Sequence, residues 1–288
     1  MVRFTLKWLL GGLALIAGAG EIGLRAVGAL DFPLFQTDPA IGYFPQPNQR
    51  GAYLRRHHWV FNERSMGTAR PFMPSPDAVL LVGDSIVYGG NPLDQPDKLG
   101  PTLDRVSHRP IYPLSAGGWA FANELAMVRG NPDLLATPTI VVVANSGDYG
   151  EIAPWTSALN WPIVRPLSAI NYNLRKFLFK PQDVVFSAKS AEASRRWQTD
   201  LAWLLEHYHG RLIWVLYPTL AELHRPRPAD FDPVLAQLHG RAEIVDVFGD
   251  ARWTAKFYRD GVIHPSAAGD RVLAGIIADQ LAKPAPAR

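Results

Sequence analysis

The sequence predicts an α/β fold, with a parallel sheet of about five strands and helices on both faces. From residue 77 onward, short apolar runs alternate with segments of helical periodicity. The apolar runs are continuous rather than alternating, which is typical of strands covered on both faces. With 288 residues, the chain is long enough to bury such a core. In a sheet of this kind, the functional loops follow the carboxyl ends of the strands.

Five segments are the predicted strands. The strongest are 139–144 and 212–217, which read TIVVVA and LIWVLY. β-branched and aromatic residues are enriched in strands, and Pro138 marks the start of the first of these two. The full set of predicted strands is 78–82, 109–114, 139–144, 212–217 and 243–247.

Three segments are the predicted helices, and each carries a start or stop signal. In residues 191–209 apolar side chains recur at helical spacing, and Gly210 follows. Residues 123–129 are followed by Gly-Asn-Pro, a sequence that ends helices. Residues 266–281 begin at a serine, which is a favoured N-cap residue.

Residues 1–30 are predicted to form a hydrophobic helix that acts as a signal anchor or a signal peptide. Arg3 and Lys7 precede an uncharged apolar run over residues 8–20, which is the layout of export segments. Residues 17–19 offer a small-residue cleavage site, whereas the apolar character that resumes after Glu21 favours a retained anchor. The protein is then anchored in the inner membrane facing the periplasm, or secreted to the periplasm. A buried helix of a soluble domain is the remaining interpretation.

The rest of the chain divides into three predicted parts. Residues 31–76 are rich in proline and glycine without a persistent period, so we expect an irregular, exposed extension. Residues 77–288 carry the strand and helix pattern of the main domain. Within it, residues 151–187 do not match that pattern and are expected to be an insertion.

Composition excludes several classes of function. The formal net charge is only +3 and no run of Lys and Arg occurs, so we expect no nucleic-acid partner. The chain has no cysteine, which excludes disulfides, thiolate metal sites and a cysteine nucleophile.

Polar residues follow the first three predicted strands. Gly83-Asp84-Ser85 ends the first, Gly117-Gly118 follows the second, and Asn145 and Asp148 follow the third. Each motif alone is equally well read as a turn. Together they supply a hydroxyl, a backbone N–H that a ligand can approach closely, and a side-chain amide. These are the groups that acyl transfer through an oxyanion requires.

A histidine with a nearby carboxylate precedes the last predicted helix. His264 lies four residues after Asp260, and a histidine that acts as general base needs a partner on its second ring nitrogen. Alone, this pair would be read as a surface loop. Combined with Ser85, it completes the set of groups for serine acyl chemistry.

These motifs resemble those of the SGNH/GDSL hydrolases, in particular membrane-anchored bacterial members. Gly83-Asp84-Ser85 is similar to the first block of that family, and DGVIHPSAAG at residues 260–269 is similar to its last block. The resemblance covers residues 77–288, and IGYFPQPN and FNERSMGTARPF in the extension look like the anchored members. It implies a flavodoxin-like parallel sheet and the hydrolysis or transfer of acyl groups.

The resemblance also implies a role for each residue. Ser85 is the expected nucleophile, His264 the base and Asp260 its partner. The N–H groups of Ser85 and Gly118, with the amide of Asn145, are expected to form the oxyanion hole. Asp84 and Asp148 are expected to support the site, and no metal or organic cofactor is required.

The sequence departs from the family pattern at two places. The third block is usually Gly-x-Asn-Asp, whereas this chain has Asn145-Ser-Gly-Asp148, so that Gly147 stands at the family's Asn position. Asp260 and His264 are separated by three residues rather than two.

We therefore expect a serine esterase that acts on acyl esters, chiefly O-acetyl esters of an envelope or exported polysaccharide. The insertion carries Trp155, Trp161, Arg165, Tyr172 and Arg175, which suit an acidic glycan or, equally, anchor the insertion in the core. Two rival functions remain open. One is a polysaccharide O-acetyltransferase that uses the same residues, and the other is a catalytically weak glycan-binding or assembly protein on this fold.

Overall fold

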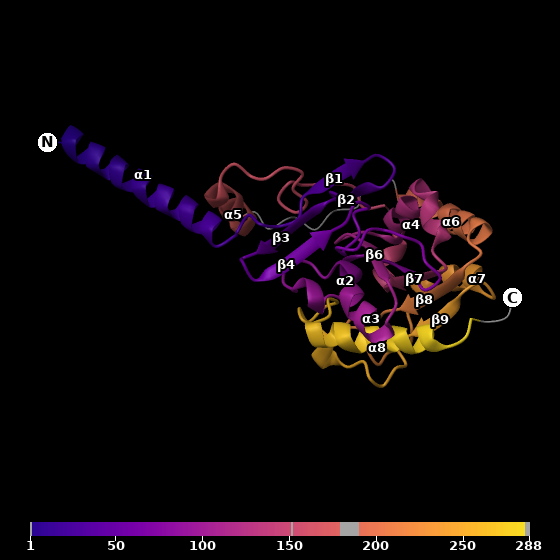
Figure 1. Ribbon diagram of the computed structural model, residues 1–288. Helices are drawn as coiled ribbons and strands as arrows, with labels where there is room; N and C mark the ends of the chain where they lie inside the picture. Colours follow the sequence, from indigo (N-terminus) through magenta and orange to yellow (C-terminus); the bar gives the residue numbers. More distant parts are fainter. Residues whose placement is uncertain (1, 151, 179–189, 286–288) are drawn as a thin grey trace.

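The computed structural model describes residues 2–150, 152–178 and 190–285 (Figure 1). Its centre is a parallel five-stranded sheet in the order β6-β5-β7-β8-β9. Numbered along the chain within this sheet, that order is 2-1-3-4-5, the flavodoxin-like arrangement that the sequence predicts. The strands are β5 (Val79–Gly83), β6 (Ile111–Ser115), β7 (Thr139–Ala144), β8 (Arg211–Leu216) and β9 (Glu243–Asp246).

Helices cover both faces of the sheet, as predicted (Figure 1). Leu80 and Val82 of β5 face the cluster that contains α4 (Phe121–Gly130) and α6 (Ser190–His207). The alternate residues of β5 face the second cluster, with α3 (Leu99–Ser107) and α8 (Ala267–Ala282). The shorter helices are α2 (Ser85–Tyr88), α5 (Ala169–Leu178) and α7 (Asp232–Leu238), with 3-10 turns at Gln95–Asp97, Pro132–Ala136, Ser146–Tyr149, Ala229–Phe231 and Ala255–Phe257.

The predicted strands agree with the structure except at their ends. Thr139–Ala144 is a strand at the predicted bounds, and the others are shifted by one or two residues. The largest shift is at the start of β6. Pro110 has no N–H for the ladder and uses only its carbonyl, which accepts the N–H of Val79 at 2.9 Å.

The prediction of an irregular, exposed extension over residues 31–76 was wrong for residues 35–61, whereas residues 67–76 contain no helix or strand and none of them is buried. Residues 35–61 form two antiparallel hairpins, β1 (Phe35–Asp38) with β2 (Gly42–Pro45) and β3 (Gln49–Tyr53) with β4 (His57–Phe61). The strands have four or five residues, too few for an alternating pattern to stand out. Their buried aromatic residues belong to the same core cluster as one face of the large sheet: Phe35, Tyr43, Trp59 and Phe61.

The first helix, α1 (Val2–Ala26), extends away from the body of the protein (Figure 1). Its segment Trp8–Ala26 is long and apolar enough to cross a membrane, and none of it is buried in the protein. An anchor or signal helix shows these properties, whereas a core helix would be mostly buried.

The predicted insertion lies between β7 and β8. Its described residues, 152–178, contain α5 and no strand. The predicted limits at 151 and 187 fall outside the described residues. Hydrogen bonds tie the insertion to the first hairpin: the N–H of Phe35 donates to the Pro162 carbonyl, and Gln46 donates to the Ile163 carbonyl, both at 2.9 Å.

Candidate active site

The end of β5 turns sharply and presents the hydroxyl of Ser85. A Cβ on Gly83 would lie 2.5 Å from a methyl group of Val87 and 3.1 Å from the Val143 carbonyl, so the turn has room only for glycine. Asp84 then caps α2, because its carboxylate accepts the N–H of Ile86 at 2.8 Å. The cap fixes the turn and leaves the Ser85 side chain at the carboxyl edge of the sheet.

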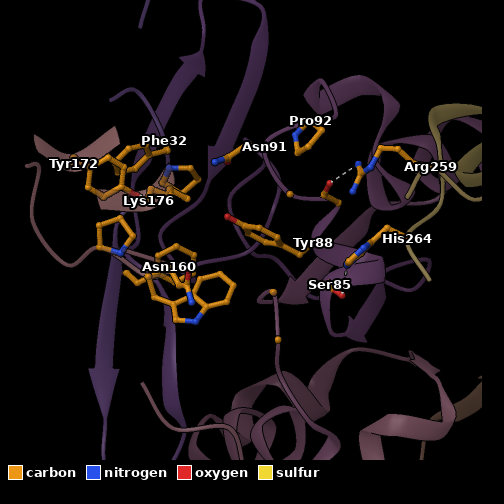
Figure 2. Close-up of a pocket in the computed structure, with 18 residues that line it drawn as sticks. Phe32, Ser85, Tyr88, Asn91, Pro92, Asn160, Tyr172, Lys176, Arg259 and His264 are labelled. Atoms are coloured by element: carbon orange, nitrogen blue, oxygen red, sulfur yellow. Dashed lines mark hydrogen bonds between the residues drawn. The ribbon is translucent and has the colours of Figure 1, made fainter. Parts of the chain in front are cut away.

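His264 connects Ser85 to Asp260. Nε2 of His264 lies 3.0 Å from Oγ of Ser85, and its Nδ1 contacts the carboxylate of Asp260. The three side chains come from opposite ends of the main domain, since the serine and the histidine are 179 positions apart in the chain. The structure therefore brings the three predicted residues into one hydrogen-bonded row, with the imidazole in the middle. Figure 2 shows Ser85 and His264 of this row.

The extra residue between Asp260 and His264 is accommodated by the loop. Gly261 takes a left-handed conformation with φ of 72°. This allows one oxygen of Asp260 to accept the N–H groups of Val262, Ile263 and His264 at 2.9, 3.1 and 3.2 Å. Its other oxygen contacts the imidazole of His264, so Asp260 and His264 pair despite the longer spacing.

Hydrogen bonds keep Asp260 ionised. Partial burial alone would raise its pKa, but hydrogen bonds from His264 and from the N–H groups of Val262 and Ile263 outweigh this and lower the pKa to about 2. A carboxylate with this pKa can hold the imidazole in one tautomer and stabilise an imidazolium cation.

Gly118 offers a backbone N–H beside Ser85. It has a φ of 73° and lines the same groove as Ser85 and His264. Its N–H has no hydrogen-bond acceptor among the described residues. Tyr43 holds the preceding peptide, because its hydroxyl donates to the Gly117 carbonyl at 2.7 Å. The Gly118 N–H is therefore both positioned and available to a ligand.

Asn145 and Asp148 form a closed capping unit. The Asn145 amide donates to Asp148 at 2.7 Å and lies 3.4 Å from the carboxylate of Asp84, while its oxygen accepts the N–H of Gly147 at 2.8 Å. Asp148 in turn accepts the Asn145 N–H at 2.7 Å. Asn145 is buried and is used inside this unit, so its role as an oxyanion donor stays a prediction.

Three carboxyl groups are buried behind the nucleophile: Asp84, Asp148 and Glu124. Burial raises the pKa of all three, and repulsion between them adds to the shift for Asp148 and Glu124. The N–H of Ile86 and the charge of His264 oppose the shift at Asp84. Neither carboxyl oxygen of Glu124 has a hydrogen-bond partner among the described residues, so its protonated form is favoured.

A groove of about 500 Å³ leads away from Ser85 (Figure 2). Trp161 forms one wall near the nucleophile. Its indole stacks on Tyr43 at 4.9 Å, and its ring carbons come within 2.8 and 3.3 Å of where Cβ atoms on Gly117 and Gly118 would lie. The lining consists of Phe32, Pro33, Phe35, Ser85, Tyr88, Gly89, Gly90, Asn91, Pro92, Gly117, Gly118, Asn160, Trp161, Pro162, Tyr172, Lys176, Arg259 and His264.

The residues singled out in the insertion have different positions. Trp161 and Tyr172 line the groove. Trp155 packs against the core and donates to the Trp161 carbonyl at 2.7 Å. Arg165 donates to the carbonyls of Leu30 and Phe32, so it joins the insertion to the N-terminal segment. Arg175 is in the last turn of α5 and is not among the residues that line the groove.

Several groove residues were not predicted from the sequence. Phe32 and Phe35 come from the segment that was expected to be irregular, and their burial carried no periodic signal. Arg259 adjoins Asp260, and its guanidinium lies 3.3 Å from the Gly89 carbonyl. Lys176 lines the end of the groove on α5. Within the described residues, no group of three or more His, Asp or Glu could hold a metal ion.

Comparison with known proteins gave matches among solved structures. No protein-family model and no curated protein sequence matches the chain. A GDSL-like lipase from Bacteroides thetaiotaomicron is 14% identical, with coverage of 71% of this chain and 87% of its own and a TM-score of 0.43. A lipase/acylhydrolase from Enterococcus faecalis is 15% identical, and the match covers 75% of this chain and 100% of the lipase, with a TM-score of 0.44. An acetyl-xylooligosaccharide esterase from Geobacillus is 13% identical, and the match covers 75% of this chain and 99% of the esterase, with a TM-score of 0.42.

These solved structures include the kind of GDSL hydrolase that the motifs resemble. All three identities lie below 25% and all three TM-scores below 0.5. The geometry of the site itself must therefore carry the functional conclusion.

Proposed function

We propose that this protein is a serine esterase of the SGNH/GDSL type. The observation that carries the proposal is the row of Ser85, His264 and Asp260, with 3.0 Å between the serine Oγ and the imidazole Nε2. This row opens into a groove that also contains a glycine N–H without an acceptor among the described residues. A nucleophile, its base, an orienting carboxylate and an oxyanion donor within one groove constitute a complete acyl-transfer site.

In the first half of the reaction, Nε2 of His264 accepts the proton of Ser85 and Oγ attacks the ester carbonyl carbon. Asp260 stabilises the imidazolium that forms. The N–H groups of Ser85 and Gly118 donate to the oxyanion of the tetrahedral intermediate. When this intermediate collapses, the C–O bond to the alcohol breaks and His264 returns the proton to the leaving oxygen.

In the second half, water attacks the acyl-enzyme and the same groups act again. His264 accepts a proton from the water as its oxygen bonds to the acyl carbon. Collapse of the second intermediate returns the proton to Ser85 Oγ and releases the carboxylic acid. The steps require only side chains and backbone groups of this chain.

Asp84 supports this cycle as a brace for the nucleophile. Its second oxygen lies 3.2 Å from Ser85 Oγ, so it competes with His264 for the serine proton. Burial raises the pKa of Asp84, despite opposing contributions from the Ile86 N–H and His264. The Ile86 N–H holds the other oxygen of Asp84, so this carboxyl group fixes the turn that carries Ser85.

The walls of the groove favour a small acyl group on a larger carrier. Trp161 leans over Gly117 and Gly118, which limits the space beside the oxyanion donor. The remainder of the groove combines aromatic residues with the polar groups of Asn91, Asn160, Lys176 and Arg259, and this combination suits the faces and hydroxyls of sugar rings. An O-acetyl ester on an exported polysaccharide fits these features, and the export helix is consistent with that location.

A fluorophosphonate probe tests the proposal, because it reacts with an activated serine whatever ester the protein acts on. The full chain in detergent is incubated with the probe, and the labelled peptide is identified by mass spectrometry. We expect one label, at Ser85, and its loss in His264→Ala but not in His239→Ala, an exposed histidine outside the groove. A folded protein that remains unlabelled refutes the esterase proposal.

A further inference from the structure

The helix α5 is attached to the C-terminal part of α1 (Figure 1). The carboxylate of Glu21 accepts the N–H groups of Ala169 and Ile170 at 2.8 and 3.0 Å, which are the first donors of α5. It also accepts the Ser168 hydroxyl at 3.1 Å. On the next turn of α1, Arg25 donates to the Leu167 carbonyl. The position of α5 along the axis of α1 is therefore fixed by several hydrogen bonds.

The length of α1 places this attachment at a membrane surface. The candidate span Trp8–Ala26 has 19 residues, which as a helix is about 29 Å long. The hydrocarbon core of a bilayer is about 30 Å thick. Glu21 and Arg25 are in the last two turns of this span, so they lie near one edge of the hydrocarbon core. Glu21 and the start of α5 then lie at the interface.

The outer face of α5, together with Leu167 two residues before it, is apolar and is exposed in the described part of the chain. Ala169 and Tyr172 are buried against the protein. On the other side, Leu174, Phe177 and Leu178 have helical spacing i, i+3 and i+4. The exposed fractions are 96% for Leu167, 52% for Leu174, 80% for Phe177 and 61% for Leu178, and these four residues are called the α5 face.

Charge and position favour a lipid surface as the occupant of this face. Arg175 flanks it in the last turn of α5, and a basic, amphipathic helix of this kind binds at the interface of anionic membranes. The candidate span α1 carries the face to such a surface. Soluble proteins rarely expose a large apolar area unless that area binds another protein or a membrane.

The groove runs between α5 and Ser85. Tyr172 and Lys176 of α5, and Phe32, which follows α1 closely in the chain, line one end of the groove. Ser85 and His264 lie at the other end (Figure 2). A substrate that enters beside α5 thus starts at the level of the bilayer surface.

We propose that the α5 face rests on the bilayer that α1 crosses, with anionic headgroups against Arg175, and that the groove takes its ester from that surface. The ester is carried on an amphiphile whose acylated polar part reaches Ser85 while its apolar part stays in the membrane. This second statement rests on the proposed esterase function. The membrane contact does not depend on it.

The absence of cysteine allows a direct test of the contact. The full chain is reconstituted in vesicles of phosphatidylcholine and phosphatidylglycerol after Phe177→Cys and attachment of an environment-sensitive fluorophore. Ile244→Cys, on the edge strand β9 and 40% exposed, is the matched control. We expect quenching by doxyl lipids to be about threefold stronger at position 177 than at position 244, with a blue-shifted emission.

Two results would overturn the membrane contact. One is equal quenching at the two positions. The other is a blue-shifted emission at position 177 without lipid quenching, which would mean that a second copy of the chain covers the face.

The substrate statement is tested with two esters. The double substitution Phe177→Glu and Leu178→Glu is expected to lower the hydrolysis of peracetylated octadecyl glucoside in vesicles about tenfold, because both charges are expelled from the interface. The hydrolysis of 4-nitrophenyl acetate in solution is expected to stay unchanged. An equal loss on both esters, or on neither, refutes the substrate statement. If the wild-type protein hydrolyses neither ester, the esterase proposal fails, whereas the quenching result still decides the membrane contact.

Discussion

The substitution Gly118→Ala tests the oxyanion donor most directly. The new Cβ would lie 3.0 Å from the hydroxyl oxygen of Tyr43 and 3.3 Å from a ring carbon of Trp161. Tyr43 has little freedom to retreat, because its hydroxyl is bonded to the Gly117 carbonyl at 2.7 Å and its own carbonyl accepts the Trp119 indole N–H at 2.6 Å. The peptide that carries the Gly118 N–H must shift instead.

Two effects are expected, one on stability and one on rate. Alanine at a φ of 73° costs about 1–2 kcal/mol. Complete loss of one oxyanion donor costs about 3–4 kcal/mol of transition-state stabilisation, and a displacement of the donor lowers the rate by about 10²-fold. We therefore expect kcat/KM to fall about 10²-fold.

The matched control is Gly240→Ala. Gly240 has a φ of 69°, nothing within 4 Å of its Cβ position, and no contact with the groove. Both variants should lose stability through the same backbone strain, and Gly118→Ala should lose more because of its contacts with Tyr43 and Trp161. Activity is measured with 4-nitrophenyl acetate and as the rate of fluorophosphonate labelling. If Gly118→Ala keeps the activity of Gly240→Ala, the Gly118 N–H is not the oxyanion donor.

Three other substitutions have defined expectations. Asp260→Asn should lower kcat/KM by about 10⁴-fold without unfolding the protein, because the imidazole loses the carboxylate that sets its tautomer; unchanged kcat/KM would exclude that role. Tyr43→Phe should lower the free energy of unfolding by about 1 kcal/mol and also lower kcat, because the Gly117 carbonyl loses its donor; a stability loss with unchanged kcat would show that Tyr43 does not position the hole. Glu124→Gln should raise the melting temperature, and by more at pH 9 than at pH 5; a gain independent of pH would contradict the buried, protonated state.

The sign of the Glu124 effect follows from linkage. Burial raises the pKa of Glu124 well above 4.5, so the folded state holds a proton that the unfolded state releases. The wild-type protein thus loses stability as pH rises from 4.5 through the folded pKa, whereas a glutamine does not titrate. Glu243→Gln is the control of opposite sign. A hydrogen bond from Arg211 lowers the pKa of Glu243, so its contribution to stability is present above pH 4.5 and is lost as pH falls.

Much of the fold could be predicted because its signals are local. A buried parallel strand must be apolar on both faces, so β7 and β8 are visible as uninterrupted runs. The hairpins at β1–β2 and β3–β4 were missed because their strands are short and are buried by contacts with distant segments. Tyr43, for example, packs on Trp161, which lies 118 positions later in the chain. Its hydroxyl donates a hydrogen bond to the carbonyl of Gly117, which lies 74 positions later.

The sequence by itself indicated a parallel sheet and placed Ser85, Gly118 and Asn145 at the carboxyl ends of its strands. It also indicated that His264 and Asp260 act as a pair. Only the tertiary structure decided that Asn145 is occupied with Asp148 and Asp84, that Trp161 stands over the glycines, and that the groove runs to α5 beside α1. The physical reason is that periodicity and turn chemistry act between near neighbours, whereas the shape of a groove depends on which distant side chains fill the same space.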